Sequence, residues 1–191
     1  MRELVYYIAA TLDGFIARQD GSFDDFPWDE AFIDALKVSY PETLPAPMRP
    51  GSNREQNLRF DAVLMGRATY EVGVKEGLTS PYPTLDQYVV SRSMSESPDP
   101  AVTLIRSDVA ERVGELKAET GKAIWICGGS QLATTLFLAG LVDRVVLKSA
   151  PVFFGAGIPL FRDQVEGVSL RKETHRSFDS GYSITEFLVE Q

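Results

Sequence analysis

The stretch AIWICGGSQLA, residues 123–133, decides the fold class of this sequence. The apolar run AIWIC predicts a buried strand, and the segment that follows the two glycines has the apolar spacing of a helix. A buried strand that turns directly into a helix is the repeating unit of α/β proteins with a parallel sheet. The glycines allow close backbone approach, and the helix start offers free N–H groups that suit a phosphate or pyrophosphate. The same pair of glycines is also compatible with a tight turn that binds no ligand.

The rest of the chain continues this alternation of short apolar runs and helical segments. The pattern predicts strands at 3–9, 61–66, 87–91, 102–105, 123–127 and 143–149, helices at 28–38, 108–121 and 130–141, and a short helical turn at 67–73. Two alternating runs, 167–178 and 181–190, are joined by an Asp-Ser-Gly turn and predict an antiparallel hairpin. We expect one domain over residues 1–191, a three-layer α/β sandwich whose central mixed sheet is mostly parallel, with flanking helices and a C-terminal antiparallel hairpin.

One helix and one loop carry more detailed expectations. Asp108 has Glu111 three residues later, which predicts a capped start for helix 108–121, and Gly121 is expected to close that helix. Residues 40–52 contain four prolines and a glycine. This composition predicts a surface excursion without regular structure, and the excursion and the loop after the first strand are candidate lids.

The composition excludes several classes of chemistry. There is one cysteine, Cys127, and one histidine, His175, so no intramolecular disulfide and no zinc site with several Cys and His ligands can form. A metal held by carboxylates alone stays open, but we assign no metal ligand. With 27 acidic and 19 basic residues, the net charge of −8 argues against nucleic-acid or anionic-membrane partners. No apolar run is long enough for a membrane span and no targeting segment is evident, so we expect a cytoplasmic protein.

Polar and cationic residues directly follow two more of the expected strands. Gly66, Arg67 and Thr69 follow strand 61–66, and the tripeptide SRS at 91–93 follows strand 87–91. Ligand sites in open α/β sheets gather at the carboxyl ends of the parallel strands. Together with the Gly-Gly turn, these residues predict one extended anion-binding groove, shaped for a nucleotide cofactor. Each of these motifs is weaker evidence by itself, since Arg67 is also compatible with a solvated surface charge and Thr69 with an ordinary turn residue.

Three other segments supply candidates for the rest of the site. Small Ala9, at the end of the first strand, lets a flat ring lie against the backbone, and Asp13 is either a site carboxylate or a turn residue before a glycine, the role we favour. Lys148, on the sixth expected strand, either faces the pocket and binds a substrate anion or points outward. The Gly-rich apolar segment 151–161 either closes the pocket or is a plain loop.

Taken together, these motifs resemble the dihydrofolate reductase-like superfamily. The similarity is strongest to the reductase domain of the bifunctional riboflavin-biosynthesis deaminase-reductase and its stand-alone relatives. The matching pieces are IAATLDGFIA, DAVLMGRATYE, YVVSRS, IWICGGSQLA and VVLKSAPVFFGAGIPLF, in family order between residues 3 and 161. The resemblance implies a central mixed sheet flanked by helices, and NADPH as hydride donor. The zinc-deaminase signature cannot be built from one His and one Cys, so only the reductase part is expected.

The resemblance also implies roles for individual residues in binding NADPH. It places Ala9 at the nicotinamide carboxamide, Ile16 beside the ring, Gly66, Arg67 and Thr69 along the phosphates, Ser91 and Arg92 at the adenosine 2′-phosphate, and Gly128, Gly129, Ser130 and Gln131 at the pyrophosphate. Arg92 at the 2′-phosphate position favours NADPH over NADH.

The substrate side is less defined. Dihydrofolate reductases place a buried acid on the first helix, and this sequence offers Asp24, Asp25, Asp29 and Glu30 there without a way to choose. We take Trp28, Phe32 and Lys148 as candidate substrate contacts, with Asp13 or water as the proton donor.

The expected reaction is hydride transfer to a carbonyl or imine carbon of a small heterocycle, similar to 5-amino-6-(5-phosphoribosylamino)uracil or to a pterin. The alternative is a nucleotide-binding or regulatory protein that keeps the groove without turnover. A Rossmann-type dehydrogenase is disfavoured because no G-x-G-x-x-G follows the first strand. The terminal hairpin leaves a sheet edge open, which favours a homodimer.

Overall fold

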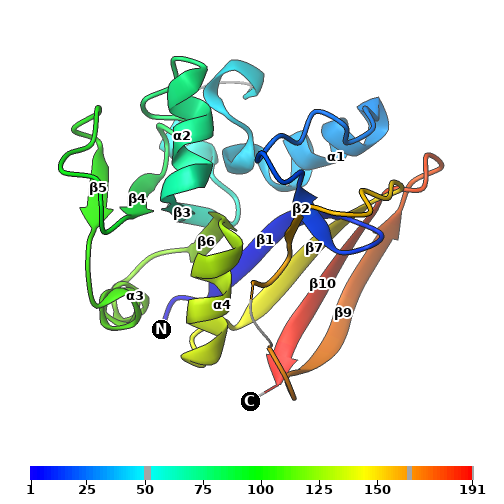
Figure 1. Cartoon of the computed structure of the whole chain (residues 1–191). Coiled ribbons are helices and arrows are strands. Elements are labelled where there is room, and N and C mark those ends of the chain that lie inside the picture. Colours follow the sequence, from blue (N-terminus) through cyan, green and yellow to red (C-terminus); the bar gives the residue numbers. More distant parts are fainter. Residues whose placement is uncertain (50–52, 163–164, 191) are drawn as a thin grey trace.

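A mostly parallel sheet forms the centre of the molecule in the computed structural model, which describes residues 1–49, 53–162 and 165–190. The sheet consists of β1 (Leu4–Thr11), β3 (Phe60–Gly66), β4 (Asp86–Val90), β5 (Val102–Ile105), β6 (Ala123–Gly128), β7 (Arg144–Ala150), β9 (Ser169–Ser177) and β10 (Ser183–Glu190). Their order is β5-β4-β3-β6-β1-β7-β10-β9 (Figure 1). All pairs from β5 to β7 are parallel, and only β10 with its two neighbours is antiparallel. This confirms the expected mixed sheet and its terminal hairpin.

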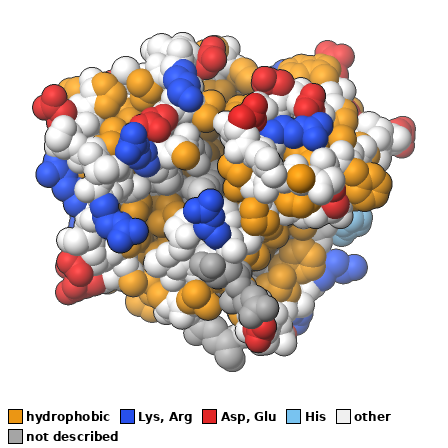
Figure 2. All heavy atoms as spheres, in the orientation of Figure 1, with side chains coloured by type: hydrophobic (Ala, Val, Ile, Leu, Met, Phe, Trp, Pro, Cys, Tyr) orange, Lys and Arg blue, Asp and Glu red, His pale blue; other side chains and the backbone are white. Residues whose placement is uncertain are grey.

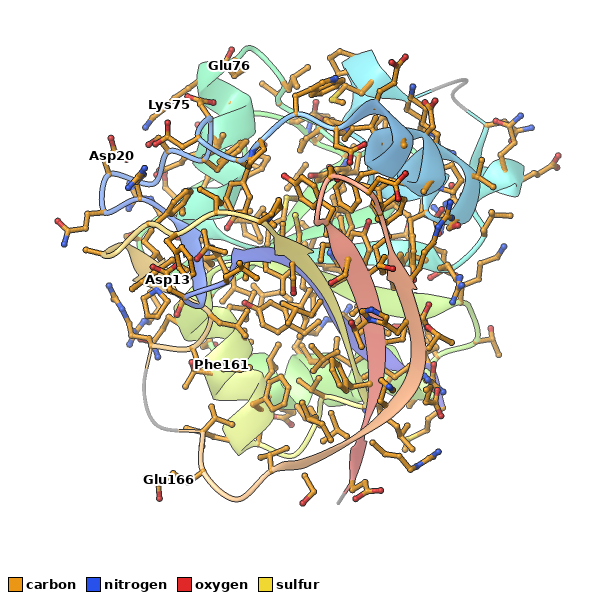
Figure 3. The ribbon with its side chains drawn as sticks, turned by 90° about the vertical axis from the view of Figure 1, so that its right-hand side faces the viewer. Asp13, Asp20, Lys75, Glu76, Phe161 and Glu166 are labelled. Atoms are coloured by element: carbon orange, nitrogen blue, oxygen red, sulfur yellow. The ribbon has the colours of Figure 1, made fainter. Side chains whose placement is uncertain are left out.

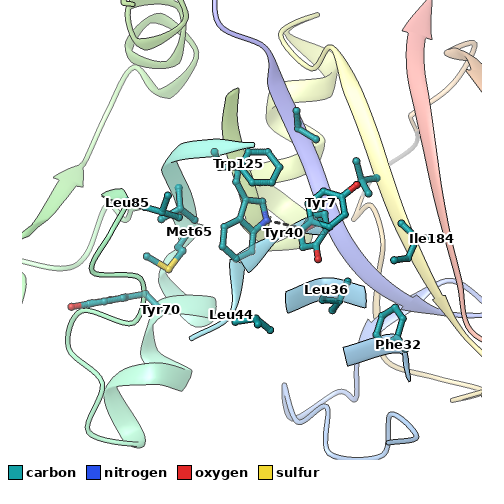
Figure 4. Close-up of a cluster of buried hydrophobic side chains, with 14 of the residues drawn as sticks. Tyr7, Phe32, Leu36, Tyr40, Leu44, Met65, Tyr70, Leu85, Trp125 and Ile184 are labelled. Carbon is teal, nitrogen blue, oxygen red and sulfur yellow. Dashed lines mark hydrogen bonds between the residues drawn. The ribbon is translucent and has the colours of Figure 1, made fainter. Parts of the chain in front are cut away.

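Four helices cover the two faces of this sheet: α1 (Glu30–Ser39), α2 (Arg67–Lys75), α3 (Val109–Ala118) and α4 (Ser130–Leu138). Phe32 and Leu36 of α1 and Tyr70 of α2 belong to one hydrophobic cluster, which also contains Tyr7 and Trp125 of the sheet (Figure 4). The buried side chains of α3 and α4 belong to a second cluster. The three expected layers are therefore present, with α1 and α2 on one face and α3 and α4 on the other.

Alternation along the strands assigns residues to the two clusters. On β1, Val5 and Tyr7 face the first cluster, whereas Tyr6 and Ile8 face the second. The indole N–H of Trp125 donates to the backbone oxygen of Tyr7 at 2.9 Å, which ties β6 to β1 within the first cluster (Figure 4). Every side chain of β1 is buried except at Ala9, which is half-buried.

The Pro-rich segment differs from its expected form. Pro41–Thr43 and Ala46–Met48 form 3₁₀ turns, each with proline at the first or second position, where the missing N–H costs nothing. Glu42 and Leu44 are buried, and the Glu42 carboxylate accepts hydrogen bonds from the backbone N–H groups of Arg59 (2.5 Å) and Phe60 (2.6 Å). The expectation of a surface excursion is therefore wrong for residues 41–44. Residues 50–52 of the expected excursion lie outside the described residues.

Two further local expectations fail. Asp108 precedes α3 in the left-handed conformation (φ 50°), and its side chain makes no capping hydrogen bond. The helix ends at Ala118, so Gly121 does not close it. A Cβ on Gly121 would lie 2.6 Å from Asp61 Oδ2, so this glycine is required by crowding instead.

A second, two-stranded sheet was not expected from the sequence. It pairs β2 (Phe15–Ala17) with β8 (Ile158–Pro159), which are too short to show an alternating pattern. Among the described residues, no helix is both long enough and apolar enough to cross a membrane.

Candidate active site

The carboxyl ends of the parallel strands bring the predicted phosphate-binding residues together. A Cβ on Gly129 would lie 3.4 Å from the Cα of Gly66, so the turn after β6 touches the turn after β3. Helix α2 begins directly after Gly66 and α4 directly after Gly129, and neither has a side-chain cap at its first turn. Two helix N-termini with free N–H groups therefore start side by side, which is an arrangement suited to a pyrophosphate.

The first residue of α4 adds a specific polar group to this arrangement. Ser130 is buried, and its hydroxyl has no hydrogen-bond partner in the described part of the chain. Gly129 has φ +94°, a conformation that L side chains rarely adopt, and a Cβ on Gly128 would lie 3.3 Å from the hydroxyl of Thr69. A buried hydroxyl without a partner is costly unless a ligand or water satisfies it, so these residues fit a phosphate group.

Arg67 links the turn after β3 to the loop after β4. Its guanidinium donates to Glu71 Oε1 and to the hydroxyl of Ser93, both at 2.6 Å. Sequence reasoning placed Ser93 in the SRS cluster but gave it no role. The hydrogen bond between Arg67 and Ser93 shows that the turn after β3 and the loop after β4 lie side by side.

The two residues expected at the 2′-phosphate have different environments. Ser91 is buried, and its hydroxyl accepts from the backbone N–H groups of Ser93 (3.3 Å) and Met94 (3.1 Å), so it shapes the loop. Arg92 is exposed and makes no hydrogen bond or ion pair with any described residue. In the face shown in Figure 2, cationic and anionic side chains are interspersed.

On the other side of the Gly-Gly turn, the sheet surface is partly open. Ala9 of β1 lies opposite Lys148 of β7 in the strand register, and both face the first cluster. Cys127 of β6 is also half-buried on this face. Burial lowers the pKa of Lys148 to about 8, and burial raises the pKa of Cys127 to about 11.

Comparison with known proteins identifies the family of this chain. The family model described as the RibD C-terminal domain matches residues 2–184. The chain belongs to the RibD C-terminal domain family. The uncharacterized protein YwjB of Bacillus subtilis is 34% identical over 179 residues, which is 93% of this chain and 92% of YwjB.

Two solved structures show the same fold. A putative riboflavin biosynthesis protein from Shewanella sp. PV-4 has a TM-score of 0.73 at 23% identity, and the match covers all of both chains. Dihydrofolate reductase from Enterococcus faecalis, solved with NADP(H), has a TM-score of 0.66 at 16% identity, and the match covers 99% of this chain and 97% of that one. The fold of this RibD-family chain is therefore dihydrofolate reductase-like.

Asp13 forms a latch between two loops of this RibD-family chain. Its carboxylate accepts from the Thr11 hydroxyl and from the backbone N–H groups of Phe154 (3.1 Å) and Gly155 (2.7 Å). Figure 3 shows Asp13 on the same side of the molecule as Phe161, with Asp20 further out on the loop. Desolvation raises the pKa of Asp13, but these hydrogen bonds outweigh it and lower the pKa below its usual value. The carboxylate is thus held in its ionised form, which favours the turn role over proton donation.

The two candidate substrate residues near the first helix have different environments. Phe32 is only 6% exposed and stacks on Tyr182 with ring centroids 4.3 Å apart, so it packs in the core, against its expected role as a pocket residue. Trp28 precedes α1, which begins at Glu30, and is 73% exposed. Ile16 packs against the second cluster.

None of the four candidate acids lies in a buried substrate site of the expected kind. Asp29 caps α1 through the backbone N–H of Phe32 at 2.8 Å, and it also accepts from the Ser180 hydroxyl. Asp25 pairs with Arg18, and Asp24 and Glu30 are exposed. None of the four is therefore a buried acid of the dihydrofolate reductase type.

Among the described residues, no cluster of three or more His, Cys, Asp or Glu side chains is arranged to hold a metal. Sequence reasoning did not give Cys127 or Tyr7 a place in the site. The alternation of side chains along β6 and β1 could have identified them. It puts Cys127 on the same face as Trp125, and Tyr7 on the same face as Ala9.

Proposed function

We propose that this protein is an NADPH-dependent reductase. The observation that carries the proposal is the order of the strands, β4-β3-β6-β1-β7. Along their carboxyl ends it lines up unpaired Arg92, the uncapped starts of α2 and α4, the half-buried Ala9 and then Lys148. This is the linear order of a 2′-phosphate, a pyrophosphate, a nicotinamide and a substrate.

The residues present fit this cofactor by the chemistry of their donors. Arg92 would bind the 2′-phosphate, and the N–H groups of α2 and α4 with the Ser130 hydroxyl would bind the pyrophosphate. The small side chain of Ala9 leaves room for the nicotinamide on the sheet. When bound, NADPH supplies a hydride from C4 of its nicotinamide, and the chain supplies orientation and exclusion of water.

The substrate side supports a small flat molecule with a reducible carbonyl or imine carbon. Ala9 and Cys127 are small, and Lys148 is a cation next to them without an anionic partner in the described chain. A pyrimidine similar to 5-amino-6-(5-phosphoribosylamino)uracil and a pterin both have this chemistry. The family supports the pyrimidine first.

Fluorescence titration tests the cofactor part of the proposal. Trp125 lies two residues before Cys127 on the same face of β6, so NADPH bound at this edge is expected to quench its emission. Arg92→Ala should weaken NADPH binding by about 1.5–3 kcal/mol, roughly 10- to 150-fold, and leave NADH binding unchanged. The matched control is Arg171→Ala, which removes an exposed arginine from the far edge strand β9. If neither NADPH nor NADH binds, the proposed reductase function is wrong. If Arg92→Ala weakens the binding of both cofactors equally, the proposed role of Arg92 is wrong.

Turnover separates the reductase from the alternative of a nucleotide-binding protein. The alternative is favoured by one observation, that no acid of residues 24–30 is buried in the site. Loss of NADPH absorbance in the presence of ribosylaminopyrimidines or pterins supports the reductase. NADPH binding without oxidation by any of these compounds supports the binding protein instead.

The homodimer expected from the sequence stays a prediction. Every residue of β9 is exposed, and β9 is an edge of the sheet, so a second copy would pair there. Light scattering of the purified protein measures this directly, and a monomeric mass would exclude it.

A further inference from the structure

Lys148 is a cation to which the proposed binding of the NADPH phosphates gives no role. It lies opposite Ala9 on β1 and opposite Ile184 on β10. Val146 and Ala150, its neighbours on the same face of β7, are buried, whereas Lys148 is partly exposed. Lys148 and Ala9 thus lie side by side, each only partly buried, at the place where the proposed function puts the reacting carbon.

The surroundings of Lys148 offer no counter-ion. Its Nζ lies 3.7 Å from the centroid of the Tyr7 ring, a cation–π contact, and it has no hydrogen bond or ion pair with any described residue. The ionisable groups on this face are the Cys127 thiol on β6 and the hydroxyls of Tyr7, Tyr40 and Tyr82. The nearest carboxylate on β10, Glu186, already accepts from the Tyr40 hydroxyl at 2.7 Å and pairs with Arg59 at 3.6 Å. Tyr82 contacts Cys127 with O and S 3.6 Å apart, and Thr43 contacts Tyr7 with the two oxygens 3.3 Å apart. Burial raises the pKa of the thiol and of all three hydroxyls, so none is an anion at neutral pH.

We propose that Lys148 is the proton donor of the reduction, an inference that rests on the proposed function. As the hydride reaches the carbonyl or imine carbon, a C–H bond forms and the π bond to oxygen or nitrogen breaks. That heteroatom takes a proton from the Lys148 ammonium, which becomes a neutral amine and regains a proton from water. The substrate gains two electrons and two hydrogens, and NADPH is oxidised to NADP⁺.

The chemistry of the side chain suits this role. A general acid works best when its pKa is near the working pH, and burial without a counter-ion lowers the pKa of Lys148 to about 8. The ammonium form, which donates, is dominant below that pH and is lost above it. The other candidate, Asp13, is held as a carboxylate by three hydrogen-bond donors and has no proton to give at neutral pH.

Three variants test this inference in the full chain. Lys148→Met removes the proton and fills a similar volume, Lys148→Arg keeps the charge but does not donate at neutral pH, and Lys172→Met on the exposed strand β9 is the matched control. We expect Lys148→Met and Lys148→Arg to lower kcat at least about 100-fold and to keep NADPH affinity, with Lys172→Met unchanged. The wild-type kcat should fall as pH rises through about 8. A lysine that only attracts a substrate anion would instead be replaced by arginine with little loss.

A spectroscopic readout is independent of turnover. In protein labelled with ¹³C at lysine Cε, one resonance should titrate well below the usual lysine pKa of about 10.4, and it should be missing from Lys148→Met. Titration of that resonance at the usual pKa, or kcat within about threefold of wild type in a folded Lys148→Met, would overturn the inference. Failure of the wild type to bind NADPH would overturn the proposed function itself, so the two failures are distinguishable.

Discussion

The two ends of the parallel strands differ in how their polar groups are satisfied. At the amino ends, Arg2 pairs with Asp61, Lys117 pairs with Asp143 at 2.6 Å, and Arg144 pairs with Glu3 at 2.9 Å. At the carboxyl ends Arg67 pairs with Glu71 at 2.6 Å, but Arg92 and Lys148 have no ion pair and the buried Ser130 hydroxyl has no hydrogen bond among the described residues.

This difference separates stability from binding. A group with an ion pair or hydrogen bond inside the protein has already given up its contacts with water. Removing that group therefore destabilises the fold. A cation without an ion pair, or a buried hydroxyl without a hydrogen bond, gains less from the fold and can gain from a ligand. Changes at the amino ends should therefore lower the free energy of unfolding, and changes at the carboxyl ends should lower ligand affinity.

The largest effect at the carboxyl ends is expected for Gly129→Val. Gly129 has φ +94° and touches Gly66, so a β-branched side chain would strain the turn and separate the starts of α2 and α4. NADPH affinity in the folded fraction should fall at least about 100-fold, or about 2.7 kcal/mol. Isothermal titration with circular dichroism as a folding check measures this.

Gly114→Val is the control for that change, because Gly114 lies within α3 with open space around its Cβ position and without positive φ. NADPH affinity should be unchanged in Gly114→Val. Wild-type NADPH affinity in a folded Gly129→Val would contradict the assignment of this turn to the pyrophosphate.

At the amino ends, Lys117→Met should give the opposite result. The buried Lys117 ammonium donates to Asp143 and to the backbone oxygen of Leu141, both at 2.6 Å, and Asp143 also accepts from the N–H of Leu4. Removing the ammonium should cost about 2 kcal/mol of unfolding free energy, measured by urea denaturation, and should leave NADPH affinity of the folded protein unchanged.

Lys37→Met, which removes an exposed lysine paired with Asp34 on α1, should cost much less than Lys117→Met. If the two variants are equally stable, the buried pair between Lys117 and Asp143 does not stabilise the amino ends.

The strands and the glycine turns could be predicted because their signals are local. Each expected strand is present with ends shifted by at most two residues, since period-two alternation and apolar runs reflect burial on the sheet itself. The turns after β3 and β6 follow from glycines directly next to those strands. Their meeting was expected only from the rule that sites gather at the carboxyl ends, and the Gly66–Gly129 contact confirms it.

Residues whose role depends on distant partners could not be predicted. Phe32 is a core residue because Tyr182, in the final hairpin, stacks on it. Glu42 is buried in a Pro-rich segment because the backbone N–H groups of Arg59 and Phe60 need an acceptor. Local composition marks Phe32 as a pocket candidate and Glu42 as a loop residue, and only the tertiary contacts reverse both assignments.

Asp13→Asn should change ligand affinity and stability less than the variants above, because Asp13 shares features of both ends of the strands. Asp13 accepts from the N–H groups of Phe154 and Gly155, so it satisfies backbone groups as the amino-end residues do, but it lies at the carboxyl end of the sheet, where the cofactor is proposed to bind. The neutral amide has one acceptor oxygen in place of two, so the loop at 151–161 should loosen. We expect faster hydrogen exchange at Phe154 and Gly155 and a several-fold higher KM. Stability should change little, because Asp13 is only partly buried.

The pH dependence of this latch follows from its lowered pKa. Since the folded pKa of Asp13 lies below the usual value of about 3.9, the latch is complete above that value and is lost as pH falls through the folded pKa. Exchange at Phe154 and Gly155 should therefore be protected at neutral pH and lose that protection in acid only in the wild type. Asp20→Asn, on the same loop, is the control, since Asp20 bonds only within its own turn to Ser22. Equal exchange in Asp13→Asn and Asp20→Asn would show that the loop is held by β2 and β8 alone, and Asp13 would then have no part in shaping the groove.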